Sequence, residues 1–230
     1  MRWINWALAA VAAAAQLTVA QAPSAPAAPQ ARFVVVLDAA HGGDDPGGRL
    51  ANGQPEKDLT LAMSVRLRSL LQARGIQVVT TRESDTAVDL NKRAELANHA
   101  NAQACLSLHA SEAGYGTHLF VSNIAPTQPA RFEAWKTAQS AWVTRSLALA
   151  GVLNSALLHA GVTVTLGRTA LPAVDSMTCP AVAVEMAPER NSDRDGDHRT
   201  EAGLDNQAYQ ARVAEALAAA LLEWRTEAHP

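Results

Sequence analysis

The segment FVVVLDAAHGGDDPGG, residues 33–48, joins a short apolar run to a loop that contains a histidine and four glycines. Its first part, FVVVLD (33–38), has the length and the β-branched residues that are typical of a strand buried on both faces. In the loop, the glycines let the backbone pass close to another group, and His41 stands at the exit of the strand. The segment therefore predicts a buried strand that ends in a candidate metal-binding residue.

Apolar runs and amphipathic segments alternate along the rest of the chain. Leu59, Met63 and Leu67 follow helical spacing in the first amphipathic segment, which ends before Gly75. This alternation predicts an α/β fold, with one domain of three layers and a mostly parallel sheet covered by helices on both faces. The predicted strands cover 33–38, 76–81, 104–110, 117–123, 162–164 and 180–186, and 180–186 is the last clear strand. The predicted helices cover 56–74, 89–100, 129–160 and 208–224.

The first 31 residues have the composition of an export segment. A positively charged start leads into an alanine-rich apolar run, which is followed by small residues that suit cleavage and by a stretch rich in alanine and proline. The run is too short and too rich in alanine for a membrane span of about 20 strongly apolar residues, so we expect no stable membrane insertion. The alternative is an uncleaved apolar helix that holds the protein at the membrane. We expect a signal peptide over 1–22, a linker over 23–31 and the folded domain over 32–226.

Charge and cysteine content exclude some classes of protein. The net charge is -3 and no basic stripe is present, which argues against a nucleic-acid partner. The chain has two cysteines, Cys105 and Cys179, and each lies in or beside an apolar run. Two cysteines do not make a disulfide framework, so we expect both to be small buried residues rather than a redox pair.

Polar residues stand at the ends of the predicted strands, where open α/β sheets gather their functional groups. His41, His109 and Glu185 lie at the ends of three strands, and Glu56 opens the first helix. Two histidines and one glutamate form a ligand set of the catalytic zinc type, and a further carboxylate beside the metal would serve as a general base. The alternative is that the histidines are structural, as isolated histidines at strand ends often are.

Several short motifs resemble those of the zinc-dependent N-acetylmuramoyl-L-alanine amidases of bacterial cell-wall turnover, in order and approximate spacing. The resemblance extends over residues 34–224, essentially the whole predicted domain. The motifs that carry it are LDAAHGG (37–43), EKD (56–58), TRESD (81–85), the pattern L..R...AN (90–98), LSLHAS (106–111) and PAVAVEM (180–186).

The resemblance implies one Zn²⁺ per chain, held by His41, Glu56 and His109, with Glu185 as the catalytic base. It also implies hydrolysis of the amide bond between N-acetylmuramic acid and L-alanine in peptidoglycan, in the periplasm or cell wall. Two alternatives are a non-catalytic murein-binding module of the same fold and a zinc amidase or peptidase for another exported substrate. Whether an activator protein is needed stays open.

The sequence departs from the family pattern beside these residues. Asp38-Ala39-Ala40 stands where the family usually has Asp-Pro-Gly, and Ser111 stands where the family usually has asparagine. Because Asp38-Ala39-Ala40 contributes no implied ligand, we expect a changed loop path there with the ligand kept. After Glu185 the family typically reads x-Gly-Phe-Leu-Ser-Asn, whereas this chain reads MAPERN (186–191). Because that segment borders the implied active site, we expect altered substrate preference rather than altered chemistry. Asp38, as an acceptor for His41 or as a turn residue, Ser111 and His118 are candidates to contact a ligand or the substrate.

The segment 124–144 carries two prolines, Phe132, Trp135 and Trp142 shortly after the predicted strand 117–123. By its position it compares with an insertion that covers the zinc in some members of the family, which suggests a lid. Its aromatic spacing also fits an ordinary helix that packs on the core. Both interpretations remain open at this stage.

Overall fold

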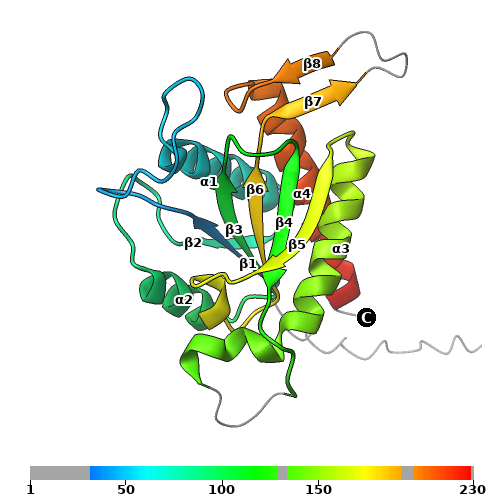
Figure 1. The fold of residues 1–230 in the computed structure, drawn as a ribbon. Helices are drawn as coiled ribbons and strands as arrows, with labels where there is room; N and C mark the ends of the chain where they lie inside the picture. Colours follow the sequence, from blue (N-terminus) through cyan, green and yellow to red (C-terminus); the bar gives the residue numbers. More distant parts are fainter. Residues whose placement is uncertain (1–31, 129–133, 193–198, 229–230) are drawn as a thin grey trace, which may run out of the picture. The chain divides into compact units, whose positions relative to one another are not determined.

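The computed structural model describes residues 32–128, 134–192 and 199–228, and Arg32–Pro230 forms one compact unit (Figure 1). Six of its strands form one sheet in the order β2-β1-β3-β6-β4-β5. All neighbouring pairs in this sheet are parallel except the pair of β4 and β6, which is antiparallel. The strands are β1 (Val34–Ala39), β2 (Gln77–Thr80), β3 (Ala104–Ala110), β4 (Thr117–Ser122), β5 (Val164–Thr169) and β6 (Ala181–Met186).

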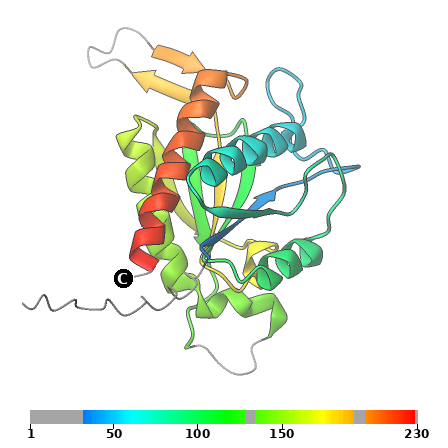
Figure 2. The same ribbon diagram turned by 180° about the vertical axis from the view of Figure 1, so that it is seen from behind.

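Helices cover both faces of the sheet, as predicted. Alternate residues of a strand point to opposite faces, and in β1 Val35 and Leu37 pack in the core formed with α1, α3 and α4, while Val34 and Val36 pack with α2 and η2. Figure 2 shows α1 and α4 lying across the first of these faces. The predicted three-layer α/β fold is confirmed. The helices are α1 (Glu56–Ala73), α2 (Leu90–His99), α3 (Val143–His159) and α4 (Gln207–Ala228), with the 3₁₀ helices η1 (Trp135–Ala141) and η2 (Val174–Ser176).

Local sequence explains where the two helices nearest the site begin and end. Asp89 caps α2, because its side chain accepts a hydrogen bond from the backbone N–H of Lys92 at 2.9 Å. Beyond α1, Gly75 adopts a φ of +74°, a conformation that favours glycine and lets the chain turn back toward β2. Both helices begin near the sheet edge that carries His41 and lead the chain to the opposite edge, where β2 and β3 begin.

Three predictions about secondary structure need correction. A hairpin of β7 (Glu189–Ser192) and β8 (Arg199–Ala202) follows β6, so 180–186 is not the last strand. The single helix predicted over 129–160 is divided into η1 and α3, with residues 129–133 outside the described part. The strand predicted over 162–164 is instead β5, which is longer and lies at the sheet edge.

The prediction for the two cysteines is confirmed for their burial and wrong for their pairing. Both side chains are buried, but Cys105 and Cys179 form a disulfide across a sequence separation of 74 residues. Cys105 lies in β3, and Cys179 lies just before β6, the neighbouring strand. Strand order brings them together, and strand order cannot be read from the two cysteine positions alone.

The predicted signal peptide (1–22) and linker (23–31) lie outside the described residues. Within the described residues, no single helix is long and apolar enough to cross a membrane. The pair η1 and α3, bent by 65°, passes the same test of length and composition only when both parts are taken together.

Candidate metal centre

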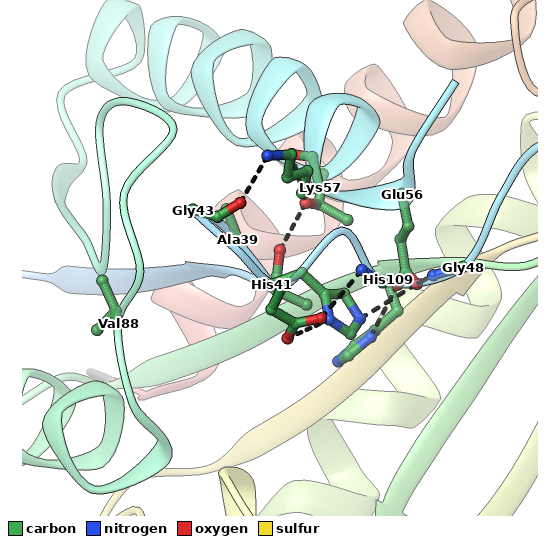
Figure 3. A network of polar contacts seen from close by, with 12 residues as sticks. Ala39, His41, Gly43, Gly48, Glu56, Lys57, Val88 and His109 are labelled. Atoms are coloured by element: carbon green, nitrogen blue, oxygen red, sulfur yellow. Dashed lines mark hydrogen bonds and ion pairs between the residues drawn. The ribbon is translucent and has the colours of Figure 1, made fainter. Parts of the chain in front are cut away.

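Three of the predicted site residues come together from three separate elements. His41 follows β1, Glu56 is the first residue of α1, and His109 lies in β3. His41 Nε2 lies 3.1 Å from Glu56 Oε2, and His109 Nδ1 lies 3.1 Å from Glu56 Oε1. Figure 3 shows both imidazoles turned toward the Glu56 carboxylate.

These atoms fit a metal ion. One ligand atom from each of the three residues lies within 4.8 Å of the others. A tetrahedral zinc with bonds of about 2.0–2.1 Å would place its ligand atoms roughly 3.3 Å apart. Each imidazole nitrogen lies 3.1 Å from its nearer Glu56 oxygen, His41 Nε2 from Oε2 and His109 Nδ1 from Oε1. Two imidazole nitrogens and one carboxylate oxygen also form the donor set of catalytic zinc sites, which leaves a position for water.

Electrostatics keep Glu56 in its anionic form. Burial raises the pKa of this carboxyl group, but the hydrogen bond with His109, the backbone N–H groups of Gly48 and Ala110 and the nearby His41 outweigh burial. The pKa of Glu56 is therefore lower than usual. The two N–H groups donate to opposite carboxylate oxygens at 2.9 and 3.1 Å, which fixes the plane of the carboxylate.

The loop that carries His41 depends on a glycine at position 47. Gly47 adopts a φ of +66°, and a Cβ there would lie 2.5 Å from His41 Cδ2 and 2.7 Å from Glu56 Oε2. Any larger residue would therefore push into the candidate site. A glycine is needed at position 47 because the backbone there passes close to two of the three candidate ligands.

The residue that orients His41 was missed by the sequence interpretation. Asp45 Oδ2 lies 2.8 Å from His41 Nδ1, the nitrogen on the side of the ring opposite to the one near Glu56. The hydrogen bond with His41 and a second one from the Gly47 N–H lower the pKa of Asp45. A carboxylate in this place fixes the tautomer and orientation of a metal-binding histidine. The only sequence signal was the i,i+4 spacing in the loop.

Asp38, our candidate for that role, instead belongs to a buried network beneath the site. Its carboxylate accepts hydrogen bonds from Arg93 Nη1 at 2.6 Å, from Thr81 Oγ1 at 2.8 Å and from Ser107 Oγ at 2.8 Å. Ser107 Oγ in turn lies 3.4 Å from His109 Nε2. Asp38 therefore reaches the side chain of a candidate ligand through Ser107, and that ligand is His109 rather than His41.

Arg93 ties this network to the backbone that leads to His41. Its guanidinium donates to the carbonyl oxygens of Ala39 and His41, both at 2.7 Å. Arg82 adds hydrogen bonds to the carbonyls of Ala39 and Ala40 at 2.9 and 3.0 Å. Because two buried guanidiniums hold consecutive carbonyls, the non-helical path from β1 to His41, where φ is +62°, is fixed.

Glu185 lies beside the candidate ligands in the sheet. In β6 it is the register partner of His109 on β3 and of His118 on β4, so the three side chains share one face. Its Oε1 lies 3.0 Å from His118 Nδ1. Ser111, another candidate, accepts a hydrogen bond from the Ala113 N–H at 3.1 Å and so shapes the turn after β3.

A cavity of 480 Å³, in the size range of ligand-binding pockets, opens beside the candidate ligands His41 and His109. A smaller cavity of 190 Å³ shares His109, Ser107, Leu90 and Ala173 with it and is otherwise lined by apolar side chains. The larger cavity is also lined by Asp38, Ala40, His41, Gly42, Asp44, Asp45, Ala87, Val88, Asp89 and Arg93.

The segment 124–144, our candidate lid, follows β4 toward the other end of the sheet. Because β4 is antiparallel to β6, its carboxyl end lies at the edge where β3 and β6 begin. Trp142 there lines a cavity with Ala102, Thr178 and Pro180, which precede those strands. Gln139 is buried and donates to two carbonyls in the same region. The described residues of this segment therefore support the interpretation as a helix that packs on the core rather than the interpretation as a lid.

This chain is similar to known proteins in both sequence and fold. A protein-family model described as N-acetylmuramoyl-L-alanine amidase matches residues 35–223. The catalytic domain of CwlV, an N-acetylmuramoyl-L-alanine amidase from Bacillus (Paenibacillus) polymyxa var. colistinus, superposes with a TM-score of 0.63 and 26% identity, covering 84% of this chain and 98% of that domain.

Two relatives are similar over shorter stretches. The germination-specific N-acetylmuramoyl-L-alanine amidase of Bacillus subtilis is 39% identical over 90 residues, which are 33% of this chain and 38% of the relative. The N-acetylmuramoyl-L-alanine amidase AmiA of Escherichia coli is 43% identical over 77 residues, which are 34% of this chain and 27% of the relative. The matched stretches thus span less than half of either relative.

Proposed function

Because the chain belongs to the N-acetylmuramoyl-L-alanine amidase family, we propose that it hydrolyses the amide bond between N-acetylmuramic acid and L-alanine in peptidoglycan. The observation that carries the proposal is the convergence of His41, Glu56 and His109 beside an open cavity, with Glu185 on the adjacent strand. In this proposal, the first three residues hold one zinc ion and Glu185 is the catalytic base. When bound, zinc supplies Lewis acidity, which lowers the pKa of water and polarises the amide carbonyl.

Glu185 moves the proton in this reaction. Its carboxylate takes a proton from the attacking water, and the water oxygen forms a bond with the carbonyl carbon of the lactyl group. The bond between that carbon and the alanine nitrogen then breaks as Glu185 delivers the proton to the nitrogen. The products are a free carboxyl group on the sugar and a free amino group on the stem peptide. The half-exposed position of Glu185, with 30% of its side chain accessible, suits a group that must reach substrate.

The two cavities, which share Ser107 and His109 in their linings, are the proposed place of the substrate. Leu90 from the start of α2 and Leu171, Pro172 and Val174 around η2 line an apolar slot next to His109. Glu56 and the backbone groups that bind it close the other side of the site. A substrate amide lying over His109 would therefore have one flank on apolar side chains and the other on the polar loop 41–48.

We also propose that the protein is exported and acts in the periplasm or cell wall. Disulfides persist in oxidising compartments and are rare in the cytosol, so the bond between Cys105 and Cys179 supports export. N-terminal sequencing of the exported protein should find a first residue between Gln21 and Arg32. A protein that still begins at Met1 would contradict cleavage and support the membrane-anchored alternative.

Product analysis tests the proposed reaction. The exported protein is incubated with purified peptidoglycan, with a chelator, and with chelator followed by zinc. Mass spectrometry should find stem peptides with free L-alanine amino groups and glycan strands without new reducing ends, and activity should disappear with chelator and return with zinc. Zinc-loaded protein that binds peptidoglycan without cutting it would support the murein-binding module, and cleavage at another amide would support a different substrate.

The variant Glu185→Gln tests the role of the base. Glutamine keeps the shape of the side chain but cannot carry the proton, so hydrolysis should fall about 10²- to 10⁴-fold. Zinc content and fold should stay as in the wild type, because Glu185 is not among the three converging ligands. Loss of zinc in this variant would make Glu185 a ligand and contradict the assignment.

A further inference from the structure

We propose that His118 is a positioning residue for Glu185: it holds one carboxylate oxygen of the base so that the other faces the substrate. The inference rests on the proposed function, in which Glu185 moves the proton. Its geometric basis is the 3.0 Å contact between His118 Nδ1 and Glu185 Oε1.

Strand pairing places the two side chains against each other. His118 and Glu185 are direct partners in the antiparallel pair of β4 and β6. Directly opposed residues in such a pair have Cβ atoms about 4.5–5.5 Å apart on the same face of the sheet. On its other side, Glu185 is the register partner of His109. The base therefore lies between a candidate ligand and His118 in one row across three strands.

The His118 ring is clamped on the protein side. Gly114 has a φ of +79°, and a Cβ at this position would lie 2.6 Å from Cε1 and 2.8 Å from Nε2 of His118. The Phe120 ring packs edge-on against the imidazole, with ring centres 6.1 Å apart. Only 14% of the His118 side chain is accessible. An imidazole held in this way presents Nδ1 to Glu185 in a fixed direction.

The hydrogen bond has one productive direction. An ionised carboxylate only accepts, so His118 must carry hydrogen on Nδ1 and donate it to Oε1. Within the described part of the chain, Oε1 is the Glu185 oxygen in side-chain contact, which leaves Oε2 for the water and the departing amine. A base that must receive and return the same proton needs a fixed carboxylate, because a displacement of about 1 Å can cost 10²-fold in rate.

Three substitutions at His118 separate hydrogen bonding from packing. His118→Leu should lower kcat about 10²-fold with little change in KM or zinc content. His118→Asn should keep most of the wild-type kcat, because the asparagine Nδ2 occupies the place of the histidine Nδ1. His118→Gln should be as slow as His118→Leu, because the glutamine Nε2 occupies the place of the histidine Nε2 instead. Equal kcat in the wild type and His118→Leu, or no advantage of asparagine over leucine, would overturn the inference.

Gly114→Ala tests the clamp independently. The added methyl group should displace the ring and lower kcat, and the loss should not add to that of His118→Leu, since both remove the same contact. Gly75→Ala is the matched control: it imposes the same backbone strain at a φ of +74° with nothing within 4 Å of the new Cβ. Additive losses for Gly114→Ala and His118→Leu would overturn the clamp.

A readout without catalysis separates this inference from the proposed function. NMR of the histidine side chains should find an exchange-protected Nδ1–H on His118 that is lost in Glu185→Ala. Its absence in the wild type would overturn the inference. A wild type that shows this proton but does not cleave peptidoglycan would overturn the proposed function and leave the contact established.

Discussion

Arg93→Met removes the cation that pairs with the buried Asp38 carboxylate, which then keeps only the hydroxyl hydrogen bonds of Thr81 and Ser107. The two side chains are only 5% and 2% accessible, and Nη1 of Arg93 lies 2.6 Å from Asp38 Oδ1. Removing one member of a buried pair costs about 3–5 kcal/mol, because the remaining charge is uncompensated. The carbonyls of Ala39 and His41 also lose a donor. We therefore expect the free energy of unfolding to fall by at least about 3 kcal/mol.

A second arginine provides a matched control. Arg68 Nη1 lies at the same 2.6 Å from Glu83 Oε1, but these side chains are 26% and 71% accessible. Solvent screens such a pair, so Arg68→Met should cost only about 0–1 kcal/mol. Urea unfolding of both variants, with chelator present so that bound metal adds no stability, gives the comparison. Equal losses in the two variants would refute the reasoning that burial decides the energy.

The double variant Asp38→Leu with Arg93→Met extends the test. Removing both charges should recover part of the stability lost in Arg93→Met, because the buried carboxylate is gone. Recovery should be incomplete, since Thr81 and Ser107 then lose the acceptor of their hydroxyl hydrogen bonds. A double variant less stable than Arg93→Met alone would contradict an uncompensated charge as the cause.

Burial raises the pKa of Tyr209 to about 12. The neutral phenol therefore contributes roughly 3 kcal/mol of stability that is present below pH 10 and is lost as the pH rises toward 12. Tyr209→Phe should make the free energy of unfolding less dependent on pH between 10 and 12, and an unchanged pH dependence would contradict this. Replacing Asp45 by alanine should weaken zinc binding about 10- to 100-fold in chelator competition, because His41 Nδ1 loses its acceptor; unchanged affinity would remove Asp45 from the site. Reduction of the Cys105–Cys179 bond should lower the free energy of unfolding by about 4 kcal/mol for a separation of 74 residues; equal stability of oxidised and reduced protein would contradict this.

Periodicity predicted the layers of the fold because each strand and helix carries its own pattern of buried residues. The direction of β4 has no such local signature. As a result, the sequence correctly placed His118 near the site but placed the segment after β4 there as well, and Trp142 in fact lies at the other end of the sheet.

The sequence could group His41, His109 and two glutamates because strand ends and a helix start meet at one edge of a parallel sheet. The family resemblance then assigned Glu56 as ligand and Glu185 as base. Their supporting contacts could not be predicted. Asp45 reaches His41 through a loop whose path depends on Gly47, and Asp38 lies in β1 facing Ser107 on the next strand. Such contacts depend on loop conformation and strand register, which single-residue patterns do not encode. The same holds for the disulfide.

Metal content tests most directly whether His41, Glu56 and His109 form one metal site. The exported protein and its variants are dialysed against metal-free buffer, and zinc per chain is measured by elemental analysis. The wild type and the control His159→Ala, whose imidazole caps the end of α3 through the Ser155 carbonyl, should each retain one zinc ion per chain, while His41→Ala and His109→Ala should retain almost none. Full zinc occupancy in either of these two variants would contradict the three-residue site.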